Sequence, residues 1–138
     1  MTLETLKLTF PKATSTTWHQ HSFGGGWVEN TAFVASTAFV GPNALVSGDA
    51  WVLDNAEVLR NAVVSGTARV SGNAKVTGDA EVFGNARVSG NAKVFGYACV
   101  SGYTLVGGDA WVSGTAKVSG DAKVYGNAWV SGNAMVTY

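Results

Sequence analysis

The chain has 138 residues, with 9 lysines and arginines, 9 aspartates and glutamates, and a net charge of zero. This length suits one domain, and the neutral balance argues against general electrostatic attraction to nucleic acid or to anionic membranes. The single cysteine excludes an intrachain disulfide. No stretch approaches about 20 apolar residues and the N-terminus lacks a basic, apolar leader, so we expect no membrane contact, no signal peptide and a cytoplasmic location.

Residues 1–26 do not follow the repeat that fills the rest of the chain. The apolar residues between positions 3 and 10 are compatible with a strand or with one helical turn. Pro11 and the Thr/Ser-rich stretch 13–17 then end that element. We predict that this segment is a cap over the first repeats, because the end of a stack of strands is an unpaired sheet edge.

His19 and His21 are the only histidines in the chain. As His-x-His on a strand, the two rings would share a face. In a trimer, three copies would bring six ring nitrogens together, an arrangement that resembles the metal-bearing tips of some phage spikes. The alternative is that both are ordinary polar residues on the surface.

From Val28 to Val136 a valine occupies every sixth position, and an alanine lies two residues before nearly every one of them. Within Ala-x-Val, side chains alternate between the two faces of a strand, and the x positions include charged residues such as Arg69. Because charges cannot line a narrow core, Ala and Val are predicted to point inward. A Gly-Asn or Gly-Asp pair then makes each corner, and we expect the Asn or Asp to adopt the left-handed backbone region that these residues tolerate.

The repeat Val-x-Gly-Asn-Ala-x over residues 27–137 resembles the hexapeptide repeat of the left-handed parallel β-helix superfamily. The lead-in Gly-Gly-Trp-Val at 25–28 resembles uncharacterised bacterial and phage proteins with GNAxVxG repeats. The resemblance implies triangular coils of about 18 residues, left-handed coiling that breaks the usual crossover rule, and trimers around a three-fold axis. If phage-encoded, the protein would lie in the host cytoplasm or in the virion.

The predicted fold is therefore all-β: a single-stranded left-handed parallel β-helix, a triangular prism of about six coils, over residues 27–138, with a short N-terminal cap over 1–26. At the C-terminus we expect the last coil to be covered by another chain, to stack end to end, or to be plugged by Trp129, Met135 and Tyr138.

One outward column of the predicted prism is more apolar than the other two, and we expect it to form the interface of a homotrimer. Its members are Trp27, Leu45, Val63, Phe83, Cys99 and Met135. An exposed apolar stripe of this length is typical of a contact surface. The alternative is that these are scattered apolar residues of an ordinary protein surface, which need no functional explanation.

Arg69 is expected to stack on Arg87, and Lys75 on Lys93, each one coil apart. Like charges directly opposite one another on neighbouring strands are destabilising. One interpretation is a small belt that binds an anion, whether phosphate, nucleic acid or an acidic partner. The other, which nearby carboxylates favour, is a charged belt that keeps the middle of the solenoid soluble.

The repeat degrades once, where two tyrosines replace the corner Asn or Asp and Thr104 replaces a core alanine. Bulky residues rarely accept positive φ, so both corners are predicted to be reshaped. The patch predicted to bind a partner consists of Phe95, Tyr97, Tyr103 and Leu105. Neutral drift or a trimer contact is the alternative.

The best known proteins on this scaffold are acyltransferases and γ-type carbonic anhydrases. The transferases use a histidine near a subunit cleft and the anhydrases use three zinc-binding histidines, whereas these repeats contain none. We therefore expect no enzyme activity and no cofactor, and predict a rigid, trimeric interaction protein that binds another protein through aromatic patches, as a virion component or an inhibitor of a host system. The alternative is a divergent acyltransferase-like enzyme.

Overall fold

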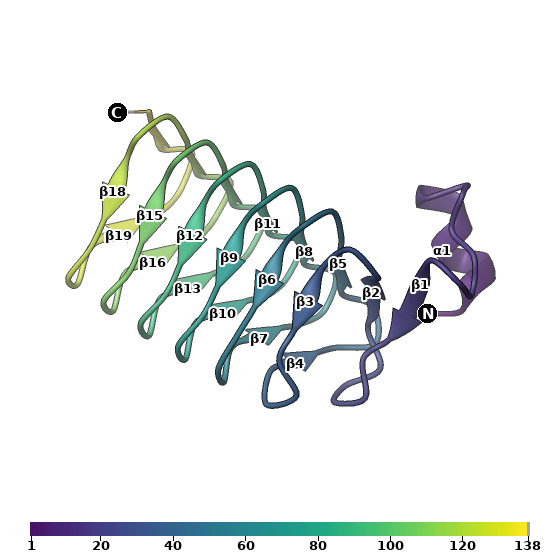
Figure 1. The fold of residues 1–138 in the computed structure, drawn as a ribbon. Coiled ribbons are helices and arrows are strands. Elements are labelled where there is room, and N and C mark those ends of the chain that lie inside the picture. The colour runs from purple at the N-terminus through teal and green to yellow at the C-terminus, as the bar shows by residue number, and fades with distance from the viewer. Residues whose placement is uncertain (138) are drawn as a thin grey trace.

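The computed structural model describes residues 1–137, which form an all-β parallel β-helix with a short helix at one end (Figure 1). Three parallel sheets form the sides of the prism, and two of them contain 6 strands each, which corresponds to about six coils. The predicted fold class, with its N-terminal cap, is confirmed. Tyr138, the last residue of the predicted β-helix, lies outside the described residues.

The N-terminal cap contains α1 (Leu3–Thr9) and β1 (Trp18–Gln20). We call the three sides of the prism the cap face, the arginine face and the lysine face. The cap face is built from β2 (Trp27–Glu29), β5 (Leu45–Val46), β8 (Val63–Val64), β11 (Glu81–Val82), β14 (Cys99–Val100), β17 (Lys117–Val118) and β20 (Met135–Val136). The arginine face is built from β3 (Phe33–Val34), β6 (Trp51–Val52), β9 (Arg69–Val70), β12 (Arg87–Val88), β15 (Leu105–Val106) and β18 (Lys123–Val124). The lysine face is built from β4 (Phe39–Val40), β7 (Glu57–Val58), β10 (Lys75–Val76), β13 (Lys93–Val94), β16 (Trp111–Val112) and β19 (Trp129–Val130).

The hexad determines the register of every sheet. Each strand from β2 to β17 pairs in parallel with the strand one coil further on, so that Val76 lies opposite Val94 and Val82 opposite Val100. The alanines and valines of the repeat form one continuous core, and those of the middle coils have no exposed surface. Each fully buried valine contributes roughly 1.5–3 kcal/mol of transfer free energy. The predicted inward orientation of Ala and Val is therefore confirmed.

Glycine, rather than the residue that follows it, adopts the left-handed conformation at the corners. The corner glycines from Gly48 to Gly132 have φ between 62° and 69°. In a representative corner the N–H of Ala68 donates to the carbonyl of Ser65 at 3.3 Å, with Gly66 as the first central residue. Positive φ at that position alone is the signature of a type II′ turn. The expectation that the corner Asn or Asp is left-handed is wrong, because the glycine before it already makes the turn.

The tyrosine corners keep this geometry, so the predicted reshaping is also wrong. Gly96 and Gly102 carry the positive φ, and the N–H groups of Tyr97 and Tyr103 each donate at 2.8 Å to a glycine carbonyl of the next coil. Both tyrosine side chains project outward and are 67% exposed. A bulky residue is tolerated there because its own backbone does not adopt the left-handed region.

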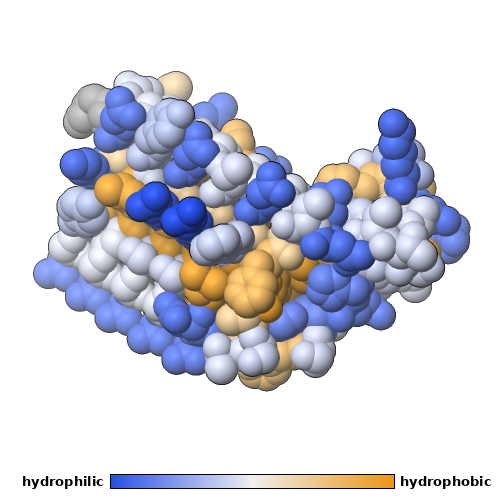
Figure 2. Space-filling model, viewed as in Figure 1, coloured by the Kyte–Doolittle hydropathy of each residue, from blue (hydrophilic) through white to orange (hydrophobic). Residues whose placement is uncertain are grey.

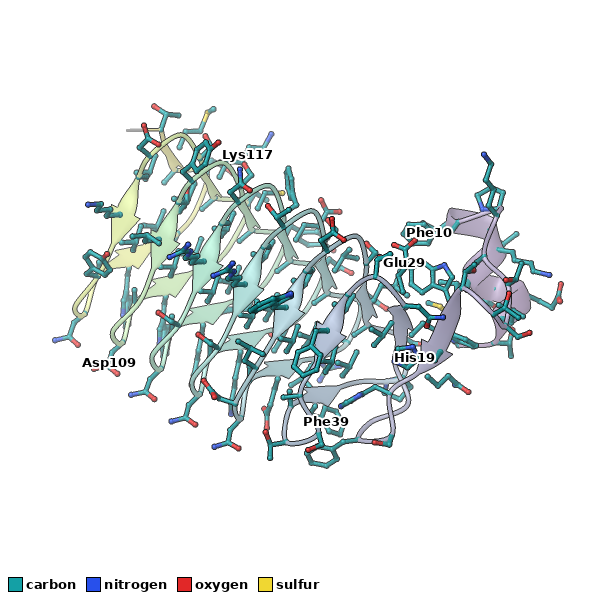
Figure 3. The ribbon with its side chains drawn as sticks, viewed as in Figure 1. Phe10, His19, Glu29, Phe39, Asp109 and Lys117 are labelled. Carbon is teal, nitrogen blue, oxygen red and sulfur yellow. The ribbon has the colours of Figure 1, made fainter. Side chains whose placement is uncertain are left out.

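Corner asparagines form a ladder along the prism. The amide of Asn73 donates to Asn91 at 3.3 Å, and the amide of Asn91 donates to Asp109 at 3.2 Å. Figure 3 shows side chains projecting from successive turns along the corner that carries Asp109. The ladder explains the amide and acid side chains at this corner by contacts between coils, without a special backbone conformation.

The cap closes much of the N-terminal end of the prism. β1 pairs antiparallel with β2, and the carbonyl of Val40 in β4 accepts the N–H of Gly26 at 2.9 Å. The sheet edge at β3 has no such cover among the described residues, and Phe33 there is 54% exposed. Helix α1 and the segment after it pack beside β2, at the opposite end from the last coil (Figure 1).

Among residues 1–137, no helix has the length and apolar character needed to cross a membrane.

Candidate interaction surface on the arginine face

The predicted trimer stripe is partly covered by the chain itself. Trp27 and Leu45 are only 8% and 6% exposed, because they pack against Leu6 and Trp18 of the cap. The indole N–H of Trp27 donates to the carbonyl of Met1 at 2.9 Å. The expectation that these two residues lie on an open apolar column is therefore wrong, since the cap covers the N-terminal part of that column.

The remaining members of that column are separated by charged residues. Val63 packs partly against the cap cluster, while Phe83 and Met135 are exposed. Cys99 is partly buried between Glu81 and Lys117 in the parallel register. Burial, and then the Glu81 carboxylate, raise the pKa of the Cys99 thiol above its ordinary value, although Lys117 opposes the shift. The thiol is therefore a poor nucleophile near neutral pH.

The two histidines do not share an exposed face. His21 is buried, and its Nε2 lies 2.8 Å from the carbonyl oxygen of Ala38, which requires that this nitrogen carry the proton. His19 is exposed, and its Nδ1 lies 2.6 Å from the side-chain oxygen of Asn30. Within residues 1–137 no group of three or more His, Cys, Asp or Glu residues is arranged to hold a metal ion. The prediction that the rings of His19 and His21 share a face, on which the metal hypothesis depends, is therefore wrong.

The predicted partner-binding patch is divided among several parts of the prism. Phe95 follows β13 on the lysine face, whereas Leu105 lies in β15 on the arginine face. Tyr97 lies at the corner between the lysine face and the cap face, and Tyr103 lies at the corner between the cap face and the arginine face. The four residues do not form one surface, because six residues along the chain carry the backbone from one side of the prism to the next.

The predicted charge belt is two separate pairs on different faces. On the lysine face, Lys75 lies 3.6 Å from the carboxylate of Glu57, and Lys93 lies over the ring of Trp111 at 5.3 Å from its centroid. On the arginine face, Arg69 lies directly opposite Arg87 in the parallel register. Neither arginine forms an ion pair with an Asp or Glu in the part of the chain that the structure describes.

Aromatic residues of the lysine face contact one another. The rings of Trp111 and Trp129 stack with 4.9 Å between centroids and 2° between planes, and Phe95 meets Trp111 edge to face at 5.8 Å. Phe95 and Trp111, with Lys75, Thr77 and Lys93, border a shallow hollow of about 330 Å³. The lysines of this face are thus paired with a carboxylate or an aromatic ring of the same chain, and the aromatic rings pack against one another.

The arginine face has no acidic side chain in either of its two outward rows. The first row contains Phe33, Trp51, Arg69, Arg87, Leu105 and Lys123, and the second contains Ala35, Leu53, Ser71, Ser89, Gly107 and Tyr125. The guanidinium of Arg69 lies 4.8 Å from the ring centroid of Trp51, a contact that restrains the arginine side chain. The face therefore combines positive charge with exposed aromatic rings.

A hollow of about 410 Å³ lies at the centre of this face. Arg69 and Arg87 border it together with Ser71 and Ser89, and apolar side chains border its ends: Leu53, Leu105 and Tyr125. Figure 2 shows this face toward the viewer, with strongly hydrophilic surface next to hydrophobic groups. Its donors are guanidinium and hydroxyl groups, so its chemistry is the binding of an anionic group flanked by apolar ones.

Gly107 is a residue of this face that sequence reasoning missed. It occupies the position after the core valine, where Ser71 and Ser89 lie in neighbouring coils, and its φ is not positive. A Cβ atom at Gly107 would lie 3.4 Å from the Tyr125 ring and 3.5 Å from the hydroxyl of Ser89. The sequence does contain a signal for this residue, because Gly107 replaces the serine found at the equivalent position of the two preceding coils.

A third hollow, of about 440 Å³, lies in the cap between Phe10, Pro11 and Trp18. Glu29 borders it, but the Glu29 carboxylate already accepts the N–H of Gly48 at 2.8 Å.

Comparisons of the chain with protein-family models, with curated proteins and with solved structures found no match. The class of protein is therefore defined by the fold itself: a parallel β-helix with a neutral overall charge and one acid-free, arginine-bearing face.

Proposed function

We propose that the chain is a non-catalytic interaction protein, a rigid β-helix that binds another protein through its arginine face. The observation that carries the proposal is the presence of exposed Trp51, Phe33 and Tyr125 around Arg69 and Arg87, with no acid in the same rows. Tryptophan, tyrosine and arginine are the residues enriched at the energetic centres of protein interfaces. Flat stacked strands with a fully packed core offer a surface that loses little conformational entropy on binding.

The partner is expected to present acidic and apolar groups to this face. Because the whole chain is neutral, attraction depends on the local field of the arginine face and not on net charge. On the resemblance of its repeat, we further propose that the chain belongs to the hexapeptide-repeat left-handed β-helix superfamily and acts as a virion component or as a phage-encoded inhibitor of a host system.

Capture of the partner tests this proposal. Tagged protein is used to capture proteins from the native source, alongside a Trp51→Ala/Arg87→Glu variant and a Lys12→Glu control in the exposed part of the cap. One stoichiometric protein should be retained by the wild type and by the control, and lost by the face variant. Equal retention by all three would show that the arginine face is not the binding surface.

The chain is further proposed to assemble as a homotrimer through the part of the cap face that the cap leaves open. The residues available there are Val63, Phe83, Cys99 and Met135. Light scattering coupled to gel filtration should give three times the chain mass of 14.2 kDa. A Phe83→Glu/Met135→Glu variant should give a lower mass, because burial of two carboxylates in an apolar contact is unfavourable, whereas a monomeric wild type would contradict the assembly.

A further inference from the structure

We propose that the hollow between Leu53 and Tyr125 is a site for an extended acidic peptide segment of the partner protein. The segment would place one or two carboxylates on Arg69 and Arg87 and apolar side chains against the two ends. This inference rests on the proposed function, since it states which part of a partner the arginine face recognises.

Arg69 and Arg87, the charged residues that border the hollow, form no ion pair within residues 1–137. Parallel register places Arg69 and Arg87 in adjacent coils, about 4.8 Å apart along the prism. Like charges at that separation repel each other, and a carboxylate between them removes the repulsion while it accepts two forked sets of hydrogen bonds. The hydroxyls of Ser71 and Ser89 border the same space and add neutral donors.

The ends of the hollow explain why a peptide fits better than a free anion. Leu53 lies one coil before the arginine pair, and Leu105 and Tyr125 lie one and two coils after it. A small inorganic ion has no group to place on them, whereas a peptide has side chains at regular intervals. Arg69 is held by Trp51 at 4.8 Å, so part of the site is ordered before a ligand arrives.

The dimensions of the site match a short strand. From Leu53 to Tyr125 the second row spans four coil steps of about 4.8 Å, or about 19 Å, and an extended chain rises about 3.3 Å per residue. About six residues therefore cover the hollow, and alternate side chains face it. A nucleic acid would need cations that follow successive phosphates, but Leu105 separates the arginine pair from Lys123.

Gly107 provides an independent way to block the site. Its φ is compatible with any residue, so a side chain there is not excluded by the backbone. A valine would project outward into the space between Ser89 and Tyr125 and would leave every charge in place. Gly107→Val therefore tests whether binding needs the open space of the hollow, while Arg87→Gln tests whether binding needs the positive charge of the arginine.

The probe is a synthetic peptide, acetyl-Leu-Ser-Glu-Ser-Glu-Ser-Tyr-amide, compared with the same peptide in which Lys replaces both Glu. Isothermal titration calorimetry at low salt should detect binding of the Glu peptide and not of the Lys peptide. Arg87→Gln and Gly107→Val should each weaken the affinity by about tenfold or more, a difference of about 1.4 kcal/mol. Lys93→Gln, on the lysine face, should leave it within about twofold. Far-UV circular dichroism and the melting temperature establish that each variant folds. If Gly107→Val does not fold, the test still rests on Arg87→Gln, which changes an exposed side chain.

Three results would overturn the inference: no binding of the Glu peptide at millimolar concentration, equal binding of both peptides, or tighter binding of single-stranded DNA or inorganic phosphate with the same sensitivity to Arg87→Gln. If the peptide fails but the captured partner still depends on Trp51 and Arg87, the proposed function stands and only the peptide site is wrong. If the peptide binds but the Trp51→Ala/Arg87→Glu variant captures the partner as well as the wild type does, the proposed function is wrong.

Discussion

At the scale of single residues, the core column tolerates one polar side chain at a cost. Thr104 occupies a position where the other coils have alanine, and it has no exposed surface. Its hydroxyl has no hydrogen-bond partner within residues 1–137. A buried hydroxyl without a partner lowers the free energy of unfolding by roughly 1–3 kcal/mol relative to a satisfied one.

Thr104→Val should therefore stabilise the protein, by about 1 kcal/mol, because it keeps the shape of the side chain and removes the unpaired hydroxyl. Urea unfolding followed by circular dichroism gives the change in the free energy of unfolding. Ser89→Ala is a matched control, since it also removes a hydroxyl, but from the surface of the arginine face, and should change stability by less than about 0.5 kcal/mol. A destabilised Thr104→Val would mean that the hydroxyl has a partner after all.

At the scale of the element, each hexad is a two-residue strand followed by a glycine turn, and glycine is required for two reasons. Gly66 has φ of 66°, and a Cβ atom on it would lie 2.9 Å from the backbone nitrogen of Gly84 in the next coil. Backbone conformation and close stacking thus exclude a side chain at the same position. Asp54 and Arg60 adopt positive φ without glycine, at 58° and 57°, and show that isolated exceptions are accommodated in the earlier coils.

Gly66→Ala should lower the free energy of unfolding by about 2 kcal/mol or more, because the alanine is strained in a left-handed conformation and its methyl group meets the next coil. Gly107→Ala is the control, since that glycine has no positive φ and a Cβ there makes only ordinary contacts at 3.4 Å and beyond. Thermal unfolding of both variants measures the difference. Equal melting temperatures would show that the corner does not require glycine.

The features of the fold that follow from the repeat could be predicted from the sequence, whereas contacts made by the N-terminal segment, which has no repeat, could not. The inward orientation of the valines follows from alternation along a strand, which depends only on spacing. Coils of three hexads, and with them the stacking of Arg69 on Arg87, were implied by the resemblance of the repeat to known hexapeptide repeats. The burial of Trp27 depends on a contact with Trp18 and Leu6 in a segment without a repeat, so no spacing indicated it. Phe95 and Leu105 are close in sequence but lie on different faces, because each hexad of a three-sided coil turns the chain onto the next face.

At the scale of the whole molecule, stability is expected to be a sum of contacts between neighbouring coils, with the cap as a terminal unit. A solenoid repeat contacts only its neighbours, so damage at one end stays near that end. The cap is attached through one cluster of buried side chains, chiefly Leu6, Trp18, Trp27 and Leu45, and through the pairing of β1 with β2. Its detachment would expose the sheet edge of β2, which is a site for pairing with another chain.

Trp18→Ala should release the cap without unfolding the prism, because it removes about 3–5 kcal/mol of packing from a cluster that the later coils do not touch. Hydrogen exchange followed by mass spectrometry should show faster exchange over residues 1–29, by at least about a hundredfold, with little change from β11 to β17. Phe23→Ala is the control within the same segment, since Phe23 is 49% exposed and its ring meets that of Phe39 edge to face with 5.0 Å between the ring centroids. Faster exchange throughout the chain in Trp18→Ala would show instead that cap and prism unfold as one cooperative unit.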